Sequence, residues 1–414
     1  MSTRPHWSSF LWFSFLLCAV AAAVGTVSEF FLWSLDAVTR VRFANGWLIW
    51  LLPVGGFAVA WIYAHVGGRS GEGNNLLIDE IHRPAAGVPR RLAPLILLGT
   101  LVTHLVGGSA GREGTAVQMG GGIAAMVARL GRLPVDRVRI LLMAGVAAGF
   151  GSVFGTPLAG AVFAVEVLVI GRIAYTALIP CFVASLGAHW VCLGWGARHD
   201  LYPVQQVPQP LPDLRLMAQV VFASLAFGMV AAAFASSSHK LTALWKKWLP
   251  SPEYRAASGG LLLIGMVHLA GTRDYLGLGV LAQHADSLHL AGMFRDAGIP
   301  ASAWLWKFAF TVITLAAGFK GGEVTPLFFI GAALGNTLAI AMGAPVDLFA
   351  ALGFVAVFAA ATKTPLACTL MGMEIFGAGL GIHLATACFA ACAISGERGI
   401  YTSQRRVRIF PPKV

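Results

Sequence analysis

Apolar segments broken by glycine and proline constrain this chain more than any other feature. They recur from residue 8 to residue 395, and several are shorter than the about 20 residues that a membrane-spanning helix needs. Charged residues make up only 11% of the 414-residue sequence, against about 25% in soluble proteins. Broken backbone inside a membrane is tolerated only where it is buried in protein or lines a cavity. The sequence therefore predicts an all-α polytopic membrane protein in which broken and re-entrant helices meet near the midplane.

Positive charge gathers in short loops and at the C-terminus. The formal net charge is +11, and residues 405–414 read "RRVRIFPPKV". Basic residues scattered between apolar runs argue against a nucleic-acid partner, because cytoplasmic loops of membrane proteins are rich in Lys and Arg. They predict a multi-pass protein of the inner (plasma) membrane with a cytoplasmic C-terminus and, from Arg4, a cytoplasmic N-terminus. The apolar run Phe10–Val24 is interpreted as a first membrane helix, since no clear cleavage site follows it.

The six cysteines all lie in or beside apolar segments, and none forms a CxxC pair. Cys388 and Cys392 could share a helix face, but small packing residues are the favoured interpretation. We therefore expect no metal site and no cofactor.

Two blocks of sequence recur in the second half of the chain. "GSAGREGTA" (108–116) aligns with "GFKGGEVTP" (318–326) at an offset of 210 residues. "TPLAGAVFAVEVL" (156–168) aligns with "TPLACTLMGMEIF" (364–376) at an offset of 208. Two blocks at nearly one offset indicate two related halves.

The repeat predicts how the chain is organised. We expect a first membrane repeat at 1–200, a proline-rich linker at 201–215 and a second membrane repeat at 216–414, without a large soluble domain. Transporters built from such repeats bind their substrate at the interface between the repeats.

Three glycine-rich segments could form anion sites. They are "GEGNNLL" (71–77), "GREGTAVQ" (111–118) and "GGEVTPLFF" (321–329). The first N–H groups of a helix have no partner inside the helix, and the helix dipole favours an anion there. Several such ends converging on one point would bind a small anion without a full positive charge.

Glu113 places a carboxylate at one of these helix ends. It can occupy the anion site itself, as an anion on a tether, and leave when it is protonated so that a free anion takes its place. Proton and anion movement would then be coupled by competition for one site. The alternative is a plain helix cap. A charge inside apolar sequence costs about 2.5–3.5 kcal/mol on insertion scales, which favours a function.

Three further charged residues have structural interpretations. Arg112 is expected to be a charge partner or an electrostatic element of a gate. Glu166 and Glu374 occupy matching places in the two repeats, and we expect them at helix ends or in structural hydrogen bonds.

These motifs resemble the CLC family of chloride channels and proton-coupled anion antiporters. That family carries a Gly-Lys/Arg-Glu-Gly-Pro motif with a gating glutamate, which corresponds to Glu113 in "GREGT". "GEVTP" (322–326) is similar to the family's "GxFxP", "TPLAGAVFAVE" (156–166) to its "APLxGxxFxxE", and "GERGIY" to the setting of its conserved tyrosine, here Tyr401. The resemblance covers about residues 10–405. It implies a CLC-type fold with two inverted repeats, a homodimer, and one anion pathway in each subunit.

Three departures from the family pattern are similar to its bacterial fluoride/proton antiporter branch. Asn74 in "GNNLL" replaces the pathway serine of "GSGIP", "GREGP" has become "GREGT", and "GEVTP" adds the carboxylate of Glu323 and the hydroxyl of Thr325. Fluoride is small and strongly hydrated, so amide, hydroxyl and backbone donors would have to replace its water. The alternative for Asn74 is a packing residue.

The resemblance gives a set of site residues. Glu113 is expected to gate the pathway and couple protons, and Glu323 to be a second pathway carboxylate. Lys320 either pairs with Glu323 across a helical turn or attracts anions at a pathway mouth. The separate intracellular proton glutamate of the chloride antiporters has no convincing match. The anion-binding residues expected around the two glutamates are Gly73, Asn74, Asn75, Gly111, Arg112, Gly114, Thr115, Gly322, Val324, Thr325 and Tyr401.

The predicted function is export of cytoplasmic fluoride across the lipid bilayer in exchange for inward protons. A chloride/proton antiporter and a passive anion channel are the alternatives within the family, and the carboxylate of Glu113 favours an antiporter. An intramembrane enzyme is not expected, because the sequence holds no HExxH motif and Ser152 in "GSVFG" lacks the GxSxG spacing.

Overall fold

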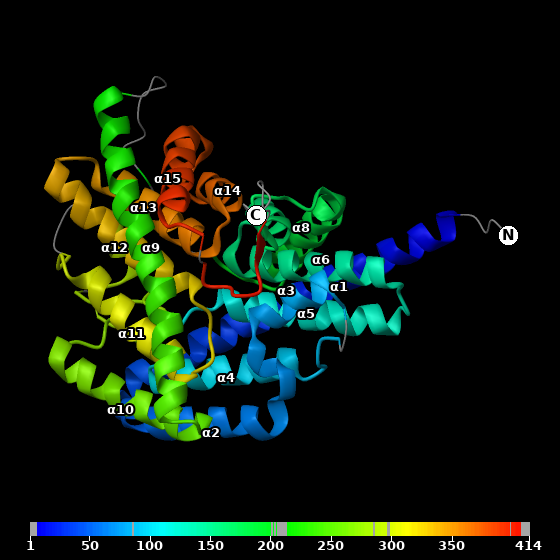
Figure 1. Ribbon diagram of the computed structural model, residues 1–414, viewed down its shortest axis with the longest axis horizontal. Helices are drawn as coiled ribbons and strands as arrows, with labels where there is room; N and C mark the ends of the chain where they lie inside the picture. The colour runs from blue at the N-terminus through cyan, green and yellow to red at the C-terminus, as the bar shows by residue number, and fades with distance from the viewer. Residues whose placement is uncertain are drawn as a thin grey trace, which may run out of the picture.

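The structure is a computed structural model that describes residues 6–84, 87–199, 202, 204, 213–284, 286–295, 299–397 and 399–406. Within these residues the chain forms 15 α-helices, short 3₁₀ and π turns, and one pair of two-residue strands (Figure 1). The all-α prediction is therefore confirmed. The predicted linker at 201–215 lies largely outside the described residues.

The helices fall into one group before that linker and one that begins at Leu214, within the last two residues of the predicted linker. Those before it are α1 (His6–Ala44), α2 (Leu52–Ile62), α3 (Asn74–His82), α4 (Leu92–Val106), α5 (Glu113–Leu130), α6 (Val135–Phe154), α7 (Pro157–Glu166) and α8 (Leu178–Gly194). Those in the second group are α9 (Leu214–Trp248), α10 (Pro252–Ala270), α11 (Ala303–Ala317), α12 (Val324–Met342), α13 (Val346–Thr362), α14 (Pro365–Phe376) and α15 (Gly381–Ile394). The strands β1 (Val169–Ile170) and β2 (Arg405–Arg406) pair in parallel.

Helices of very different length share the fold. Six segments among the described residues are long and apolar enough to cross a membrane: Ser8–Ala44, Gly46–Glu72, Val135–Phe154, Tyr175–Gly194, Leu214–Trp248 and Val324–Met342. By contrast, α3 has nine residues and α7 has ten. At 1.5 Å per residue they reach only about 15 Å, half of a hydrocarbon core of about 30 Å. The prediction of broken helices is thus confirmed.

Both halves use the same close helix crossing. α5 and α6 cross at Gly120 and Gly145, and α12 and α13 cross at Gly331 and Gly353. A Cβ atom on any of these four glycines would collide with the carbonyl oxygen of the glycine that faces it. Small residues allow such backbone contact between membrane helices, so these crossings fix the position of α5 and α12.

The two halves meet along a broad interface (Figure 1). α2 packs against α10, and α7 packs against α14. Aromatic rings fill the centre, where the Phe154 ring lies 4.9 Å from that of Phe328. After α15 the chain returns to the first half, and β2 pairs there with β1 beside α3.

The helix bounds give an offset of 211 residues between the two halves, one more than the sequence alignment. α4 and α11 are both 15 residues long and begin 211 residues apart, at Leu92 and Ala303. α5 and α12 also begin 211 residues apart, at Glu113 and Val324. The alignment at 210 had matched Glu113 with Glu323. In the structure Glu323 instead takes the place of Arg112, which explains why the two glutamates have different surroundings.

Candidate anion pathway

Two glycines tie the two halves together at the start of α5 and α12. The N–H of Gly111 donates to the carbonyl of Gly322 at 2.6 Å, and the N–H of Gly322 donates back to Gly111 at 2.8 Å. A Cβ on Gly111 would lie 2.9 Å from the backbone nitrogen of Thr325, so no larger residue fits there. This short bridge brings the N-termini of α5 and α12 together, as the glycine-rich segments predicted.

The N-terminus of α3 joins the same point. Asn74 is the first residue of α3, and Gly73 before it has φ +63°, a conformation that favours glycine. A Cβ placed on Gly114 would lie 3.3 Å from Nδ2 of Asn74 and 3.6 Å from Oε2 of Glu323. The structure therefore brings all three predicted helix ends together around Gly114.

The Glu113 side chain occupies the end of a helix in the opposite half. It is completely buried, and its Oε2 accepts hydrogen bonds from the Thr325 backbone N–H at 3.1 Å and the Thr325 hydroxyl at 2.6 Å. Its Oε1 lies 3.5 Å from Nε of Arg112. Because Thr325 is in the first turn of α12, the carboxylate takes the position where that helix would bind an anion.

Glu323 has a different environment. Its side chain is half-buried, and its Oε2 is enclosed without a hydrogen-bond partner among the described residues. Oδ1 of Asn74 is likewise enclosed and unpartnered within the described chain. Buried polar atoms are normally hydrogen-bonded, so these two oxygens mark a place where a proton, a water molecule or a donor on a ligand would be stabilised.

Two cavities lie near the residues that surround Glu113. The Arg112 cavity has a volume of about 370 Å³, and Arg40, Arg112 and Arg198 line it together with Glu29 and Asp36.

The second, the Tyr401 cavity, has a volume of about 180 Å³. Asn74, Gln118, Lys320, Glu323 and Tyr401 are among the residues that line it. The buried Glu113 lines neither cavity, but it is adjacent to Arg112 in the first and its sequence neighbour Gly114 lies close to Glu323 in the second. We interpret the two cavities as parts of an interrupted path.

Comparisons with known proteins identify the family. A family model described as "Voltage gated chloride channel" matches residues 55–396. The chain belongs to this family, the CLC family.

Two relatives are especially similar to the chain. A chloride/fluoride channel protein of Pseudomonas syringae pv. tomato is 46% identical over 394 residues, which cover 93% of this chain and 84% of that one. The crystal structure of a CLC-type fluoride/proton antiporter superposes with a TM-score of 0.92 at 34% identity, covering 98% of this chain and 100% of the other. A slow cyanobacterial Cl⁻/H⁺ antiporter shares the fold, with a TM-score of 0.79, 19% identity and 97% coverage of both chains.

Within this CLC fold, several predicted site residues line the path. Asn74, Glu323 and Tyr401 meet at the Tyr401 cavity, and Asn74 and Tyr401 also line a second small cavity together. Asn74 therefore faces the path as well as packing against its neighbour. Gly111 and Gly322 form the bridge between the halves, and Val324 is buried in the first turn of α12.

Two predicted anion-binding residues form hydrogen bonds with neighbouring elements. The Thr115 hydroxyl lies 2.8 Å from the hydroxyl of Thr100 on α4, where both side chains are fully buried. Oδ1 of Asn75 accepts a hydrogen bond from the backbone N–H of Ser403. Both interactions hold neighbouring elements in place, and Asn75 also lines the Tyr401 cavity.

The Tyr401 cavity is also lined by residues outside the predicted site set. Gln118 was not predicted, yet it lines the Tyr401 cavity and its Oε1 has no hydrogen-bond partner among the described residues. A buried amide five residues after Glu113 on a glycine-rich helix was the sequence signal that could have predicted it.

Lys320 forms no ion pair with Glu323 within the described chain. Its Nζ lies over the ring of Tyr63, 4.2 Å from the centroid, at the edge of the cavity.

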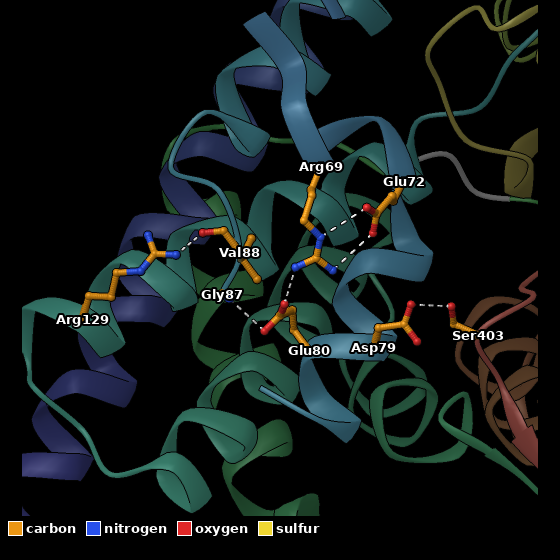
Figure 2. Close-up of polar contacts among 8 residues, drawn as sticks. All are labelled: Arg69, Glu72, Asp79, Glu80, Gly87, Val88, Arg129 and Ser403. Atoms are coloured by element: carbon orange, nitrogen blue, oxygen red, sulfur yellow. Dashed lines mark hydrogen bonds and ion pairs between the residues drawn. The ribbon is translucent and has the colours of Figure 1, made fainter. Parts of the chain in front are cut away.

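Polar contacts anchor α3 and the C-terminal segment to each other (Figure 2). The hydroxyl of Ser403 donates to Oδ2 of Asp79 at 2.8 Å. Arg69 pairs with Glu72 and, at 2.6 Å, with the buried Glu80. Since Asn74 begins α3 and Tyr401 precedes Ser403 by two residues, these contacts hold the two ends of the Asn74–Tyr401 pair.

Glu166 and Glu374 cap each other's helices across the interface between the halves. The Glu166 carboxylate accepts the backbone N–H groups of Leu366 and Ala367 at the start of α14, and the Glu374 carboxylate accepts those of Leu158 and Ala159 at the start of α7. The four distances are 2.8–3.1 Å. The expected structural hydrogen bonding of these glutamates is confirmed, and the pattern is symmetric.

Proposed function

We propose that this CLC protein exports fluoride from the cytoplasm in exchange for inward protons. The observation that carries the proposal is the pair of carboxylates along one path: Glu113 bound on the first turn of α12, and Glu323 with an unpartnered oxygen beside Asn74. The fluoride/proton activity stated for the structurally similar antiporter supports it.

The contacts of Glu113 explain how a proton could be exchanged for an anion. An ionised Glu113 accepts both donors of Thr325. Protonation removes its negative charge and weakens these hydrogen bonds, because hydrogen bonds to charged groups are about twice as strong as neutral ones. The carboxyl group then leaves, and fluoride can accept the same N–H and O–H donors at the end of α12.

Glu323 can hold the anion on the Tyr401 side. When protonated, its carboxyl is an O–H donor, and the neighbouring Asn74 amide supplies N–H donors near Gly114. Strong donors at close range are what the dehydration of a small anion requires. Hydrogen fluoride crosses membranes as the neutral acid and releases fluoride ions inside the cell. An inward proton gradient can drive the export of these fluoride ions.

The orientation follows from the distribution of positive charge. The Tyr401 cavity is proposed to open to the cytoplasm, because Arg69 and Arg129 lie near α3 on that side (Figure 2) and the basic C-terminus follows. The Arg112 cavity would then open outside an inner (plasma) membrane. The homodimer and the division into repeats at 1–200 and 216–414 stay predictions.

Purified protein in liposomes provides the test. Vesicles loaded with fluoride are diluted into fluoride-free buffer while internal pH is followed with a dye, and chloride-loaded vesicles serve as the control. We expect uphill proton uptake driven by fluoride and not by chloride. Equal responses to the two anions would indicate a general anion/proton antiporter, and fluoride loss without proton uptake would indicate a channel.

A further inference from the structure

Arg42 is a buried cation that the proposed transport path does not use. It lies in the last turn of α1, and only 9% of the residue is exposed. Its Nε is enclosed without a hydrogen-bond partner among the described residues, where the guanidinium also forms no ion pair. The guanidinium lies over the ring of Phe43, with its Cζ 4.9 Å from the centroid. A neutral ring does not balance the positive charge, and charges that are buried in proteins are normally paired with an opposite charge.

A second arginine faces the same small cavity. Arg42 and Arg273 both line a cavity of about 20 Å³, together with Thr39, Gln283 and Ser287. Asp274 is the acidic residue in the lining, and its Oδ2 accepts the backbone N–H of Leu288. Two guanidinium groups against one carboxylate leave the cavity with net positive charge.

The backbone around this cavity leaves space for the guanidinium groups. Gly277 has φ +60°, and a Cβ there would lie 2.9 Å from Nη2 of Arg42. A Cβ on Gly46 would meet the guanidinium of Arg273, whose side chain is exposed. The carbonyl of Gly277 is further held by the ammonium of the fully buried Lys307 at 2.7 Å. The positively charged groups are therefore built into the fold of this loop.

We infer that Arg42 and Arg273 form a second anion site, which takes a single halide ion outside the transport path. A volume of about 20 Å³ accommodates one small particle, and a halide is the anion of nearest size. Thr39, Leu278 and Leu281 line both this cavity and the Arg112 cavity. The site therefore lies beside the proposed outer mouth, where anions leaving the path would reach it.

The site is connected to the bridge region through one loop. The backbone N–H of Gly277 donates to the carbonyl of Gly108, three residues before Gly111. A halide that neutralises Arg42 and Arg273 would stabilise this loop against the segment that carries Gly111. The inference does not depend on whether the transported ion is fluoride or chloride.

Bromide is the probe, because its anomalous scattering locates it in a crystal. We expect an anomalous peak between the two guanidinium groups in the unaltered protein and none in Arg42→Gln. In solution, replacing gluconate by bromide at constant ionic strength should raise the unfolding temperature. Losing charge-assisted hydrogen bonds of this kind weakens binding about tenfold or more, so Arg42→Gln should shift the half-saturating bromide concentration upward by that factor.

Arg40→Gln is the matched control, since it removes the same charge from the same helix. Arg40 pairs with the exposed Asp36 and does not line this cavity. It should retain the bromide peak and the bromide dependence. Absence of a peak in the unaltered protein, or an equal peak in Arg42→Gln, would show that Arg42 only stabilises the C-terminus of α1. If Arg42→Gln and Arg40→Gln lost bromide binding equally, the effect would come from the overall positive charge of this surface and not from a specific site.

Discussion

The two halves of this CLC protein are alike in their scaffold and different along the path. In the scaffold, Glu166 and Glu374 each cap a helix of the opposite half with two hydrogen bonds. Along the path, Glu113 is satisfied by Thr325, whereas Glu323 leaves one oxygen unpartnered among the described residues. The one-residue difference in register produces this asymmetry, because Glu323 stands where the first half has Arg112.

The comparison separates two uses of a buried carboxylate. A carboxyl group that accepts two backbone N–H groups in both halves is a structural cap, held in place by those hydrogen bonds. A carboxylate whose partner lies across the path in one half only can be released or can bind a ligand. Symmetric glutamates should therefore govern stability, and asymmetric glutamates should govern transport.

The largest expected effect is the loss of proton coupling in Glu113→Gln. The amide can still accept a hydrogen bond from Thr325, but it cannot take up and release a proton. Fluoride-loaded liposomes should then show no uphill proton uptake. Glu374→Gln is the matched control from the symmetric pair, and it should retain coupling. Undiminished fluoride-driven proton uptake in Glu113→Gln would rule out its gating role.

The symmetric caps should contribute equally to stability. Glu166→Ala and Glu374→Ala each remove two hydrogen bonds to a charged carboxylate, and the expected loss is about 3 kcal/mol for either variant. Thermal unfolding in detergent should show both midpoints lowered by several degrees and by similar amounts. Glu253→Ala in the first turn of α10 is the control, because among the described residues the Glu253 carboxylate caps no helix of the opposite half. A loss in only one of the two variants would contradict the symmetric assignment.

Motifs predicted the location of the site because their residues are adjacent in sequence. The glycine-rich segments gave the three converging helix ends, and the repeats gave the matching caps. The sequence alignment was one residue off, because glycine and threonine matches do not reveal where a helix begins. Backbone hydrogen bonds between Gly111 and Gly322 fix that register, and they join residues distant in the chain.

The direction of individual side chains was the part that the motifs could not provide. Thr115 and Thr325 occur in similar motifs, but one contacts Thr100 and the other binds Glu113. Gln118 was missed because its importance depends on the packing of α3 against α5 around the Tyr401 cavity. Such contacts arise from tertiary packing, which one sequence does not reveal.

Glu323→Ala should reduce fluoride transport about tenfold, with a smaller change in chloride transport. The variant removes the donor that a protonated carboxyl offers to fluoride, and one charge-assisted hydrogen bond corresponds to about a factor of ten or more. Initial rates of fluoride and chloride efflux from liposomes measure the preference. Fluoride efflux at the parental rate would show that the second carboxylate does not contribute to anion binding.

The smallest expected effect on transport comes from replacing Thr325 by valine, and the same substitution at Thr115 is the comparison. Thr325→Val removes the hydroxyl that donates to Glu113 at 2.6 Å but keeps the backbone donor, so fluoride turnover should fall several-fold. Thr115→Val removes the hydrogen bond to Thr100 and should lower stability by about 1 kcal/mol, with the smaller change in turnover. Efflux rates and unfolding midpoints of the two variants, measured together, give the comparison. A larger transport defect in Thr115→Val would mean that the threonine of the first half, and not Thr325 of the second half, contacts the transported ion.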